Sequence, residues 1–314
     1  LKSKLGIIKA MKTKLPIKNK VIVVVGPTAS GKSELAVKIA KEVDGEIISA
    51  DSRQIYKDLN IGSGKVEGKW ENGVFMYKNV PHYLIDEVSP RVQYTVAKFQ
   101  KKARAAIADI LKRGKVPIIC GGTGHWADAV VFGQALPEVK PDGKLRAKLA
   151  KLTTPNLFKL LQSLDPGRAA EIDAQNPRRL VRALEIVMSS GKPVPKTDQN
   201  PEVYGNFDVE WVGLNPGMEV LEKKIKKRLG ERFKQGMLKE VADLRKSGVS
   251  WKRLEAFGLE YKFCALRLQS KITKEELETQ LFTAIRQYAK RQMTWFKRNK
   301  NIRWYADAKE VKKF

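Results

Sequence analysis

One short stretch near the start of the chain limits its fold more than any other. Residues 21–25 are apolar and β-branched, as in a strand buried on both faces of a sheet, and residues 34–43 place apolar side chains at helical spacing. Between them, the chain has the GxxxxGKS spacing of a phosphate-binding loop, in Gly26-Pro27-Thr28-Ala29-Ser30-Gly31-Lys32-Ser33. A strand, a glycine turn whose N–H groups can face an anion, and a helix N-terminus favour a di- or triphosphate site over a chance turn. The stretch therefore predicts an α/β protein, a P-loop NTPase-like parallel sheet flanked by helices.

Length and residue usage limit the class of protein. A chain of 314 residues can bury the cores of two domains, and no apolar run approaches the roughly 20 residues of a membrane span. Cys120 and Cys264 are far apart in apolar surroundings, which argues against a disulfide framework or a metal cluster. His82 and His125 have no paired ligand nearby and are expected to be structural. We expect a soluble cytoplasmic monomer with no membrane partner.

The net charge of +27 is far from balance. Such an excess points to a polyanionic partner, most simply a nucleic acid. The alternative is a lysine-rich composition without such a partner. Clustering of the cations on one face would favour the nucleic acid.

Two further strands are predicted to end beside the phosphate loop. Residues 46–51 form a short apolar stretch that ends at Asp51, and ligands of open α/β sheets lie beyond the carboxyl ends of the strands. The alternative role of Asp51 is to cap the segment that follows. Residues 116–124 form a buried strand and a glycine turn, with Cys120 where a P-loop ATPase normally carries an acidic residue. This pattern favours diphosphate binding over ordinary ATP hydrolysis.

The chain is predicted to contain a core and a helical insertion. Residues 1–20 are rich in lysine without an acid and predict a basic disordered tail, and residues 62–80 are glycine-rich and expected to be irregular. Proline follows Asp165 and Asn176, which marks two helix starts, and Gly191 marks a helix end. A strand at 207–214 then returns to the sheet. The predicted boundaries are a helical insertion domain at 137–202 and a P-loop core at 21–136 and 203–314.

Several helices carry cations placed for an anionic partner. The helix after Asn176 has Arg178, Arg179 and Arg182 in its first turns, where cations oppose the helix dipole. A helix capped by Asn215-Pro216 has an apolar side and an opposite side with Lys223, Lys227 and Arg228. The last long helix opens with a capping box at Thr273. Its later part has no acid and carries a basic stripe that favours RNA contact over a merely solvated face, formed by Arg286, Lys290 and Lys297 beside Gln287.

Six motifs in order carry a family resemblance. Together they resemble the tRNA dimethylallyltransferase (IPP transferase) family, over nearly the whole chain after residue 20. The motifs are the phosphate loop, Asp51-Ser52-Arg53-Gln54-Ile55-Tyr56, Pro81-His82, Gly121-Gly122-Thr123, Pro177-Arg178-Arg179-Leu180 and Arg286-Gln287-Tyr288-Ala289-Lys290-Arg291-Gln292.

The resemblance implies a reaction and roles for particular residues. It implies transfer of a dimethylallyl group from dimethylallyl diphosphate to N6 of adenosine 37, in the anticodon stem-loop of tRNA. The loop Gly26 to Ser33 would bind the diphosphate, with Mg²⁺ held partly by Ser33. Catalytic roles are implied for the general base Asp51 and for Lys32, Thr123 and Arg232. Contacts to tRNA are implied for Asp51, Ser52, Arg53, Gln54, Arg178, Arg179, Arg182, Arg286, Gln287, Lys290 and Arg291.

The chain departs from the family pattern at three places. It has Ser63-Gly64 in place of Thr-Ala, His125-Trp126 in place of Leu-Tyr, and Leu259-Glu260-Tyr261 in place of Tyr-Lys-Glu. These changes bear on contacts to the base and the anticodon loop rather than on the diphosphate site. Two other functions stay open: prenyl transfer to a free adenine nucleotide, and a P-loop nucleotide switch that binds RNA.

Overall fold

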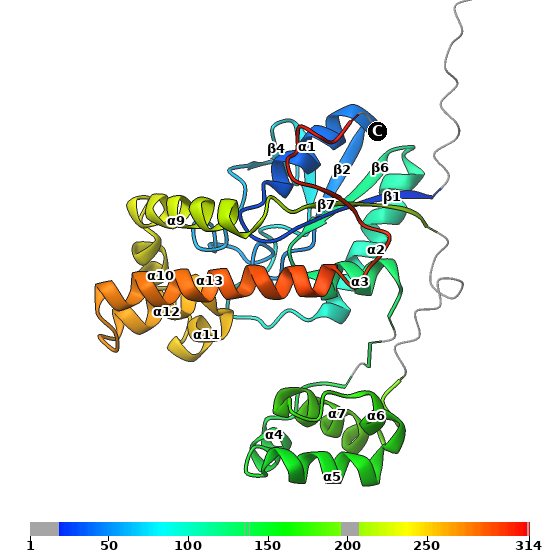
Figure 1. The fold of residues 1–314 in the computed structure, drawn as a ribbon, viewed down its shortest axis with the longest axis vertical. Coiled ribbons are helices and arrows are strands. Elements are labelled where there is room, and N and C mark those ends of the chain that lie inside the picture. The colour runs from blue at the N-terminus through cyan, green and yellow to red at the C-terminus, as the bar shows by residue number, and fades with distance from the viewer. Residues whose placement is uncertain (1–18, 135, 138, 196–206, 313) are drawn as a thin grey trace, which may run out of the picture. The chain divides into compact units, whose positions relative to one another are not determined.

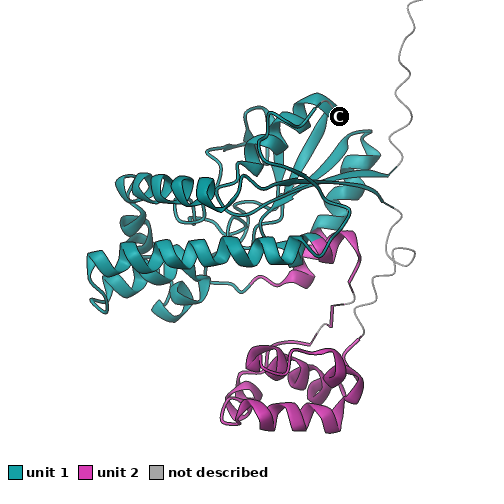
Figure 2. Cartoon of the chain, in the orientation of Figure 1, with its two compact units in different colours: residues 1–93, 103–127, 206–314 teal, residues 94–102, 128–205 magenta. Residues whose placement is uncertain are grey.

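The computed structural model describes residues 19–134, 136–137, 139–195, 207–312 and 314. Residues 1–18 of the expected basic tail therefore lie outside the described residues. The chain divides into two compact units (Figure 2). Unit 1 comprises residues 1–93, 103–127 and 206–314, and unit 2 comprises residues 94–102 and 128–205. The insertion boundaries predicted at 137–202 stay a prediction.

Unit 1 is built on one sheet (Figure 1), which has eight strands in the described residues, in the order β3-β4-β5-β2-β6-β1-β7-β8. All pairs from β5 to β8 are parallel, whereas β3 and β4 add an antiparallel hairpin. The predicted α/β class with a parallel sheet is confirmed. The strands are β1 (Lys20–Val25), β2 (Gly45–Ser49), β3 (Lys69–Glu71), β4 (Val74–Tyr77), β5 (Val80–Tyr83), β6 (Val116–Gly121), β7 (Asp208–Leu214) and β8 (Arg303–Tyr305).

The central strands are continuous apolar runs because helices cover the sheet. Val21 to Val25 of β1 are fully buried, as expected of a strand that lies between parallel neighbours. Ile22 and Val24 share a core cluster with Leu35 and Ile39 of α1. The helices that lie wholly in unit 1 are α1 (Lys32–Val43), α9 (Met218–Lys234), α10 (Met237–Lys246), α11 (Trp251–Phe257), α12 (Leu259–Leu268) and α13 (Lys274–Phe296).

Unit 2 has its own small core. Leu157, Leu161, Leu180 and Leu184 are buried against one another. Asp165 and Asn176 each cap a helix that starts with proline, and Gly191 ends the last of these helices in the left-handed conformation, as predicted. The helices are α4 (Gly143–Leu149), α5 (Thr154–Leu164), α6 (Pro166–Glu171) and α7 (Pro177–Ser190), while α2 (Val96–Lys112) and α3 (Gly124–Val131) contribute to both units.

Two local predictions were wrong, and one strand was missed. Part of the region 62–80, expected to be irregular, forms the hairpin of β3 and β4, whose short exposed strand β3 has a weak sequence pattern. The α9 helix is capped by Gly217 rather than by Asn215-Pro216, and Asn215 instead accepts a hydrogen bond from the Gly217 N–H. The edge strand β8 was not predicted. None of the described helices is long and apolar enough to cross a membrane.

Candidate active site at the carboxyl ends of the central strands

The phosphate loop lies between β1 and α1 and has the conformation that the motif requires. Gly26 has φ +154°, and a Cβ there would stand 2.6 Å from the Leu214 carbonyl oxygen. Gly31 is left-handed, with φ +97°, and directly precedes α1. Within the described residues the Ser30 hydroxyl is buried without a hydrogen-bond partner. A strand, two strained glycines and a helix start thus form the cradle of an anion site.

Gln292 of α13 connects the loop to the neighbouring strand. Its Oε1 accepts a hydrogen bond from the Thr28 N–H at 2.8 Å, and its Nε2 donates to the Gly122 carbonyl oxygen at 2.8 Å. The side chain is buried, and a Cβ on Gly122 would stand 2.4 Å from Nε2. Gln292 therefore fixes the loop to the end of β6, and Gly122 leaves the space for this contact.

Asp51 lies just beyond β2, on the same edge of the sheet. Its Oδ1 accepts hydrogen bonds from the N–H groups of Arg53 at 2.8 Å and Gln54 at 3.4 Å. The capping role considered for Asp51 is therefore real. The second carboxylate oxygen has no hydrogen bond from the described residues, so it is available to a bound substrate. One carboxylate can both hold the turn and act as a base.

Thr123 joins the ends of β2 and β6 beside Asp51. Its N–H donates to the Ala50 carbonyl at 3.3 Å, and its hydroxyl accepts from the Ser52 N–H at 3.3 Å. The Tyr288 phenol lies near Thr123 and Asp51. Burial, together with the charge of Asp51, raises the pKa of Tyr288 to about 12. Tyr288 therefore remains a neutral hydroxyl beside the carboxylate at physiological pH.

Lys32 and Arg228 lie near this carboxylate, and Arg232 lies beside Arg228. Burial lowers the pKa of Lys32, and the Arg228 guanidinium adds to the effect while Asp51 opposes it. Burial and the charge of Arg232 lower the pKa of Arg228 to about 10. Arg232 is buried and pairs with Glu260 at 2.7 Å. Cations crowded in this way are destabilised until an anion joins them.

The loop that faces the two arginines allows their close approach. Gly64 has φ +61°, and a Cβ there would stand 1.6 Å from an Arg228 guanidinium nitrogen and 2.0 Å from one of Arg232. Any larger residue would displace both guanidinium groups. The positive φ also favours glycine at this position, which departs from the family pattern.

Glu240 of α10 holds the same loop from the other side. Its carboxylate accepts hydrogen bonds from the N–H groups of residues 60, 61 and 62. It also accepts one from the Tyr261 hydroxyl at 2.9 Å, and Tyr261 in turn accepts from the Ser63 N–H at 3.0 Å. A single carboxylate thus orders the loop that contacts Arg228 and Arg232.

The other residues of the Asp51 motif mainly hold the site in place. Arg53 donates through Nε to the Phe257 carbonyl at 2.5 Å. Gln54 accepts from the Ser49 hydroxyl at 3.3 Å and donates to the Gly64 carbonyl at 3.1 Å. These bonds link β2, the loop at Gly64 and α11. The base-reading roles expected of Arg53 and Gln54 stay predictions.

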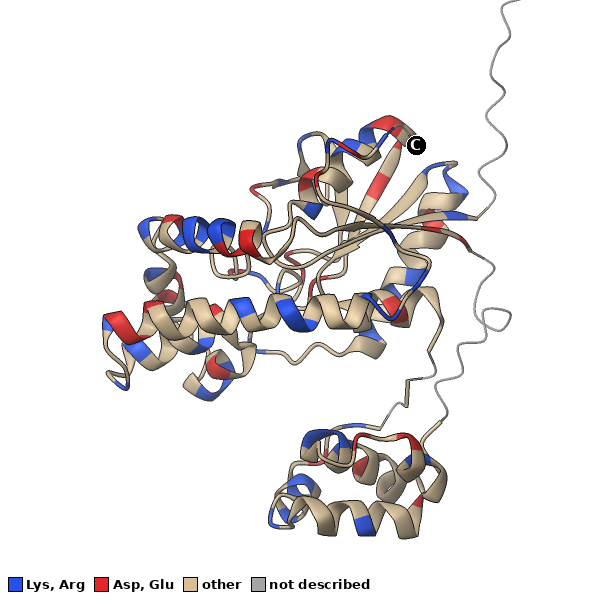
Figure 3. Ribbon diagram, in the orientation of Figure 1, with Lys and Arg blue, Asp and Glu red and all other residues tan. Residues whose placement is uncertain are grey.

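The candidate RNA contacts on α13 divide into two kinds. Arg286 forms an ion pair with Glu222 of α9, so it helps to join these neighbouring helices (Figure 1). Gln287, Lys290 and Arg291 are exposed. Acidic residues are confined to the first turns of α13, and cations occupy its later part (Figure 3).

The arginines of α7 belong to unit 2. Arg178 and Arg179 are exposed. Arg182 instead bonds Glu185 at 2.6 Å and the Val139 carbonyl at 3.2 Å. Glu185 is fully buried and also accepts from Arg146. Two of the three arginines therefore remain available to an anion, while Arg182 neutralises a buried carboxylate.

Sequence reasoning missed several residues of the site. It placed Arg228 with Lys223 and Lys227 on a polar helix face, yet those lysines pair with glutamates of α9 itself while Arg228 lies beside Asp51. Gln292 and Tyr288 were included in a motif, but no role was predicted for either. The signal for Arg228 was its spacing of four from Arg232, which puts both on one helix face. Glu240 had no signal, because its partners are backbone groups far away in sequence.

Two family models match this chain. The model described as IPP transferase matches residues 54–299, and the model described as isopentenyl transferase matches residues 19–75. A tRNA dimethylallyltransferase 2 of Shewanella sediminis is 43% identical over 280 residues, which cover 88% of each chain. A tRNA dimethylallyltransferase of Treponema pallidum is 40% identical over 284 residues, covering 90% of this chain and 88% of the relative.

Solved structures resemble the fold as well. A tRNA isopentenylpyrophosphate transferase of Bacillus halodurans aligns with a TM-score of 0.66 and 33% identity, covering 93% of this chain and 90% of its own. A eukaryotic dimethylallyltransferase acting on tRNA aligns with a TM-score of 0.74 and 27% identity, covering 93% and 74%.

Proposed function

We propose that this chain, which belongs to the IPP transferase family, transfers a dimethylallyl group from dimethylallyl diphosphate to tRNA. The acceptor atom in the proposal is N6 of adenosine 37. The observation that carries the proposal is the position of Asp51. Its carboxylate has one oxygen without a hydrogen bond from the described residues and lies in the electrostatic field of Lys32 and Arg228.

The proposed chemistry is a substitution at the first carbon of the dimethylallyl group. The bond from that carbon to the diphosphate oxygen breaks, and the diphosphate leaves with the electron pair. The adenine N6 forms the new bond to the same carbon and loses a proton to Asp51. The loop N–H groups, Lys32, Arg228 and Arg232 stabilise the charge on the leaving diphosphate.

Thr123 and Tyr288 belong to the acceptor side of the proposed site. The Thr123 hydroxyl accepts a hydrogen bond from the N–H of Ser52, next to Asp51, and Tyr288 lies near both Thr123 and Asp51. An adenine that leaves its stack to reach Asp51 would meet these hydroxyls at its polar edge. Thr123 is then a reader of the base, which agrees with its motif position.

Magnesium is also part of the proposal. Ser33 lies in the first turn of α1, directly after Lys32 of the phosphate loop. The described residues contain no group of three or more His, Cys, Asp or Glu that could hold a metal. In the proposal, Ser33 would supply a protein ligand to Mg²⁺, and diphosphate oxygens and waters would supply the others. Such an ion would neutralise charge on the diphosphate.

The state of the protein in the cell completes the proposal. We infer a monomer that acts in the cytoplasm. The free thiols of Cys120 and Cys264, both buried, support a reducing compartment.

One assay separates the proposed function from its alternatives. The protein is incubated with dimethylallyl diphosphate, Mg²⁺ and either tRNA or AMP, and N6-prenyladenosine is sought by mass. We expect product from tRNA and none from AMP. Prenylated AMP would indicate the free-nucleotide enzyme, and ATP turnover without prenyl transfer would indicate the nucleotide switch.

A further inference from the structure

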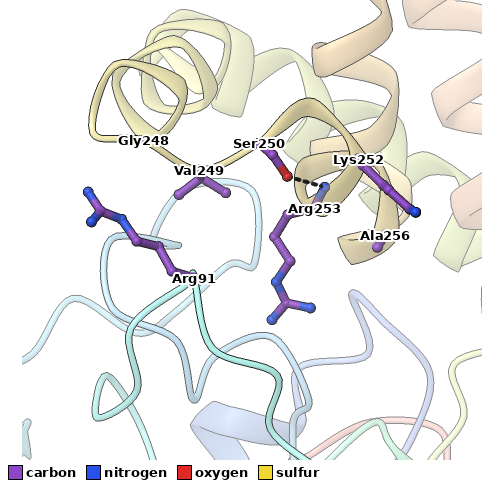
Figure 4. Close-up of a pocket in the computed structure, with 7 residues that line it drawn as sticks. All are labelled: Arg91, Gly248, Val249, Ser250, Lys252, Arg253 and Ala256. Carbon is purple, nitrogen blue, oxygen red and sulfur yellow. Dashed lines mark hydrogen bonds between the residues drawn. The ribbon is translucent and has the colours of Figure 1, made fainter. Parts of the chain in front are cut away.

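A cationic pocket lies outside the site described above. It has a volume of about 430 Å³ and is formed by the loop at Arg91, the turn before α11 and α11 itself (Figure 4). Its seven lining residues include three cations and no acid: Arg91, Gly248, Val249, Ser250, Lys252, Arg253 and Ala256. All belong to unit 1. Without a carboxylate in its lining, the pocket suits an anion from outside the chain.

The pocket is held in shape by Arg253. Its Nε donates to the Pro90 carbonyl at 2.9 Å and its Nη2 to the Val92 carbonyl at 2.8 Å. The Arg253 N–H in turn donates to the Ser250 hydroxyl at 3.2 Å. These bonds join α11 to the loop that carries Arg91, so the walls of the pocket are ordered before any ligand binds.

The charges of Arg91 and Lys252 are available to a ligand. The Arg91 guanidinium lies over Gly248, so that a Cβ on this glycine would stand 3.0 Å from Nη2. No acidic side chain among the described residues pairs with Arg91 or Lys252, and both are exposed. In Figure 4, Arg91 and Lys252 lie on either side of Arg253. A phosphate here would meet a row of cations.

The pocket is connected to the Asp51 turn through one aromatic ring. Phe257 has the Arg253 guanidinium 4.4 Å and the Arg53 guanidinium 5.8 Å from its ring centroid. The chain before Arg91 also bonds to the turn after Asp51, since the N–H groups of residues 86–88 donate to the carbonyls of residues 54 and 55. The pocket and the Asp51 turn are therefore held together within unit 1 by direct contacts.

We propose that this pocket binds a backbone phosphate of the RNA strand next to the adenosine that enters the active site. The proposal rests on the proposed function for its RNA partner. The pocket gives no base-specific contact, because its cations recognise phosphate in any sequence. Its role is to fix the register of the strand, so that a particular nucleotide faces Asp51.

The test measures RNA binding without any chemistry. Binding of an anticodon stem-loop is measured against salt concentration, without prenyl donor, for the double variant Arg91→Gln with Lys252→Gln. We expect affinity to fall about tenfold and the salt slope to flatten by about 0.7 for each phosphate that the variant no longer neutralises. The matched control is Lys41→Gln with Lys112→Gln. These exposed lysines lie in the last turns of α1 and α2, away from the carboxyl ends of the strands, so we expect little change.

A phosphate scan identifies the contact itself. Single phosphates of the stem-loop are replaced by neutral methylphosphonates and binding to the unaltered protein is measured. We expect one or two positions beside the target adenosine to weaken binding, and the double variant to lose this sensitivity at those positions. If no position is sensitive, or if the double variant matches its control, the inference is overturned.

The same variants distinguish a wrong pocket assignment from a wrong proposed function. In the transfer assay, the double variant should raise the KM for tRNA and leave the KM for dimethylallyl diphosphate unchanged. If the unaltered protein binds the stem-loop with the expected phosphate sensitivity but transfers no prenyl group, the proposed function fails and the pocket assignment stands. If the pocket instead binds an acidic protein, the double variant should bind RNA as its control does. That result would overturn the assignment.

Discussion

Asp51 has two tasks that substitutions can separate. One oxygen caps the turn at Arg53, and the other has no hydrogen bond from the described residues. Asparagine keeps the capping oxygen but cannot take a proton, whereas alanine loses both. Because capping contributes about 1 kcal/mol, the two variants should differ in stability and agree in activity.

We predict that Asp51→Asn and Asp51→Ala each lower the single-turnover transfer rate at least 100-fold. Only Asp51→Ala should also lower the free energy of unfolding, by about 1 kcal/mol, as measured by denaturant unfolding. Binding of tRNA should be largely intact in both. Turnover by Asp51→Asn at the rate of the unaltered protein would rule out the base assignment.

Arg228 offers a second test at this scale. Its pKa is lowered to about 10 by burial and by Arg232, below its ordinary 12.5. The folded state therefore disfavours the charged form, and this cost is complete below pH 10 and fades as pH rises toward 12.5. At neutral pH, Arg228→Gln should raise the Tm of the ligand-free protein.

The same variant should bind inorganic diphosphate about 10- to 100-fold more weakly, because it can no longer form a charge-assisted hydrogen bond to the anion. Calorimetric titration measures this. Lys227→Gln, one residue away on the exposed face of α9, is the control and should change neither quantity. A lower Tm together with unchanged diphosphate affinity would show that Arg228 only packs.

Individual residues also mark where sequence reasoning stops. The departures from the family pattern at Ser63-Gly64 and at Glu260-Tyr261 meet in space, since Ser63 bonds Tyr261 and Gly64 faces the arginine that pairs with Glu260. Each departure looked isolated along the chain. Their joint effect needed the fold, because it depends on a side chain and a backbone loop that are about 200 residues apart.

Among the elements, the loop at residues 60–64 depends on α10 for its order. Glu240 accepts bonds from three successive N–H groups and from Tyr261. We predict that Glu240→Gln raises the KM for dimethylallyl diphosphate more than the KM for tRNA, because the loop contacts Arg228 and Arg232. It should also lower stability by about 1–3 kcal/mol.

Hydrogen exchange at residues 60–62 gives the direct readout for this variant, since their protection should fall. Asp243→Asn is the control on the same helix, because Asp243 pairs with the exposed Lys239 and makes no bond to the loop at residues 60–64 among the described residues. Equal changes in the KM of both substrates would contradict a role confined to the diphosphate side.

The last helix, α13, has a structural side and an exposed basic side. Gln292 fixes the phosphate loop and Arg286 pairs with Glu222. Lys290 and Arg291 are exposed. Neutralising Arg286, Lys290 and Arg291 should weaken tRNA binding and flatten its salt dependence. The double variant Lys290→Gln with Arg291→Gln tests the electrostatic part alone, without disturbing the contact to α9.

For that double variant the salt slope of tRNA binding should flatten by about 0.7 for each phosphate of single-stranded RNA that is no longer neutralised. Lys290 and Arg291 are not part of the phosphate loop, so the affinity for inorganic diphosphate should stay the same. A slope identical to that of the unaltered protein would remove α13 from the RNA surface.

At the scale of the whole molecule, the fold class was predictable from clear sequence patterns. The apolar β-branched runs of β1 and β6 and the GxxxxGKS loop define a parallel sheet with a phosphate site. Short exposed strands such as β3 and β8 carry no such pattern and were missed. The position of Asp51 was predictable from the strand before it, whereas Glu240 and Gln292 act through contacts distant in sequence and needed the fold.

The most direct test of the account is a single turnover in which both products are counted. Protein in excess is mixed with dimethylallyl diphosphate, Mg²⁺ and tRNA, and the tRNA fragments and released phosphates are quantified together. The account predicts one diphosphate released for each prenyl group found on N6 of adenosine 37, and no orthophosphate. Diphosphate or orthophosphate release without prenylated adenosine would contradict it.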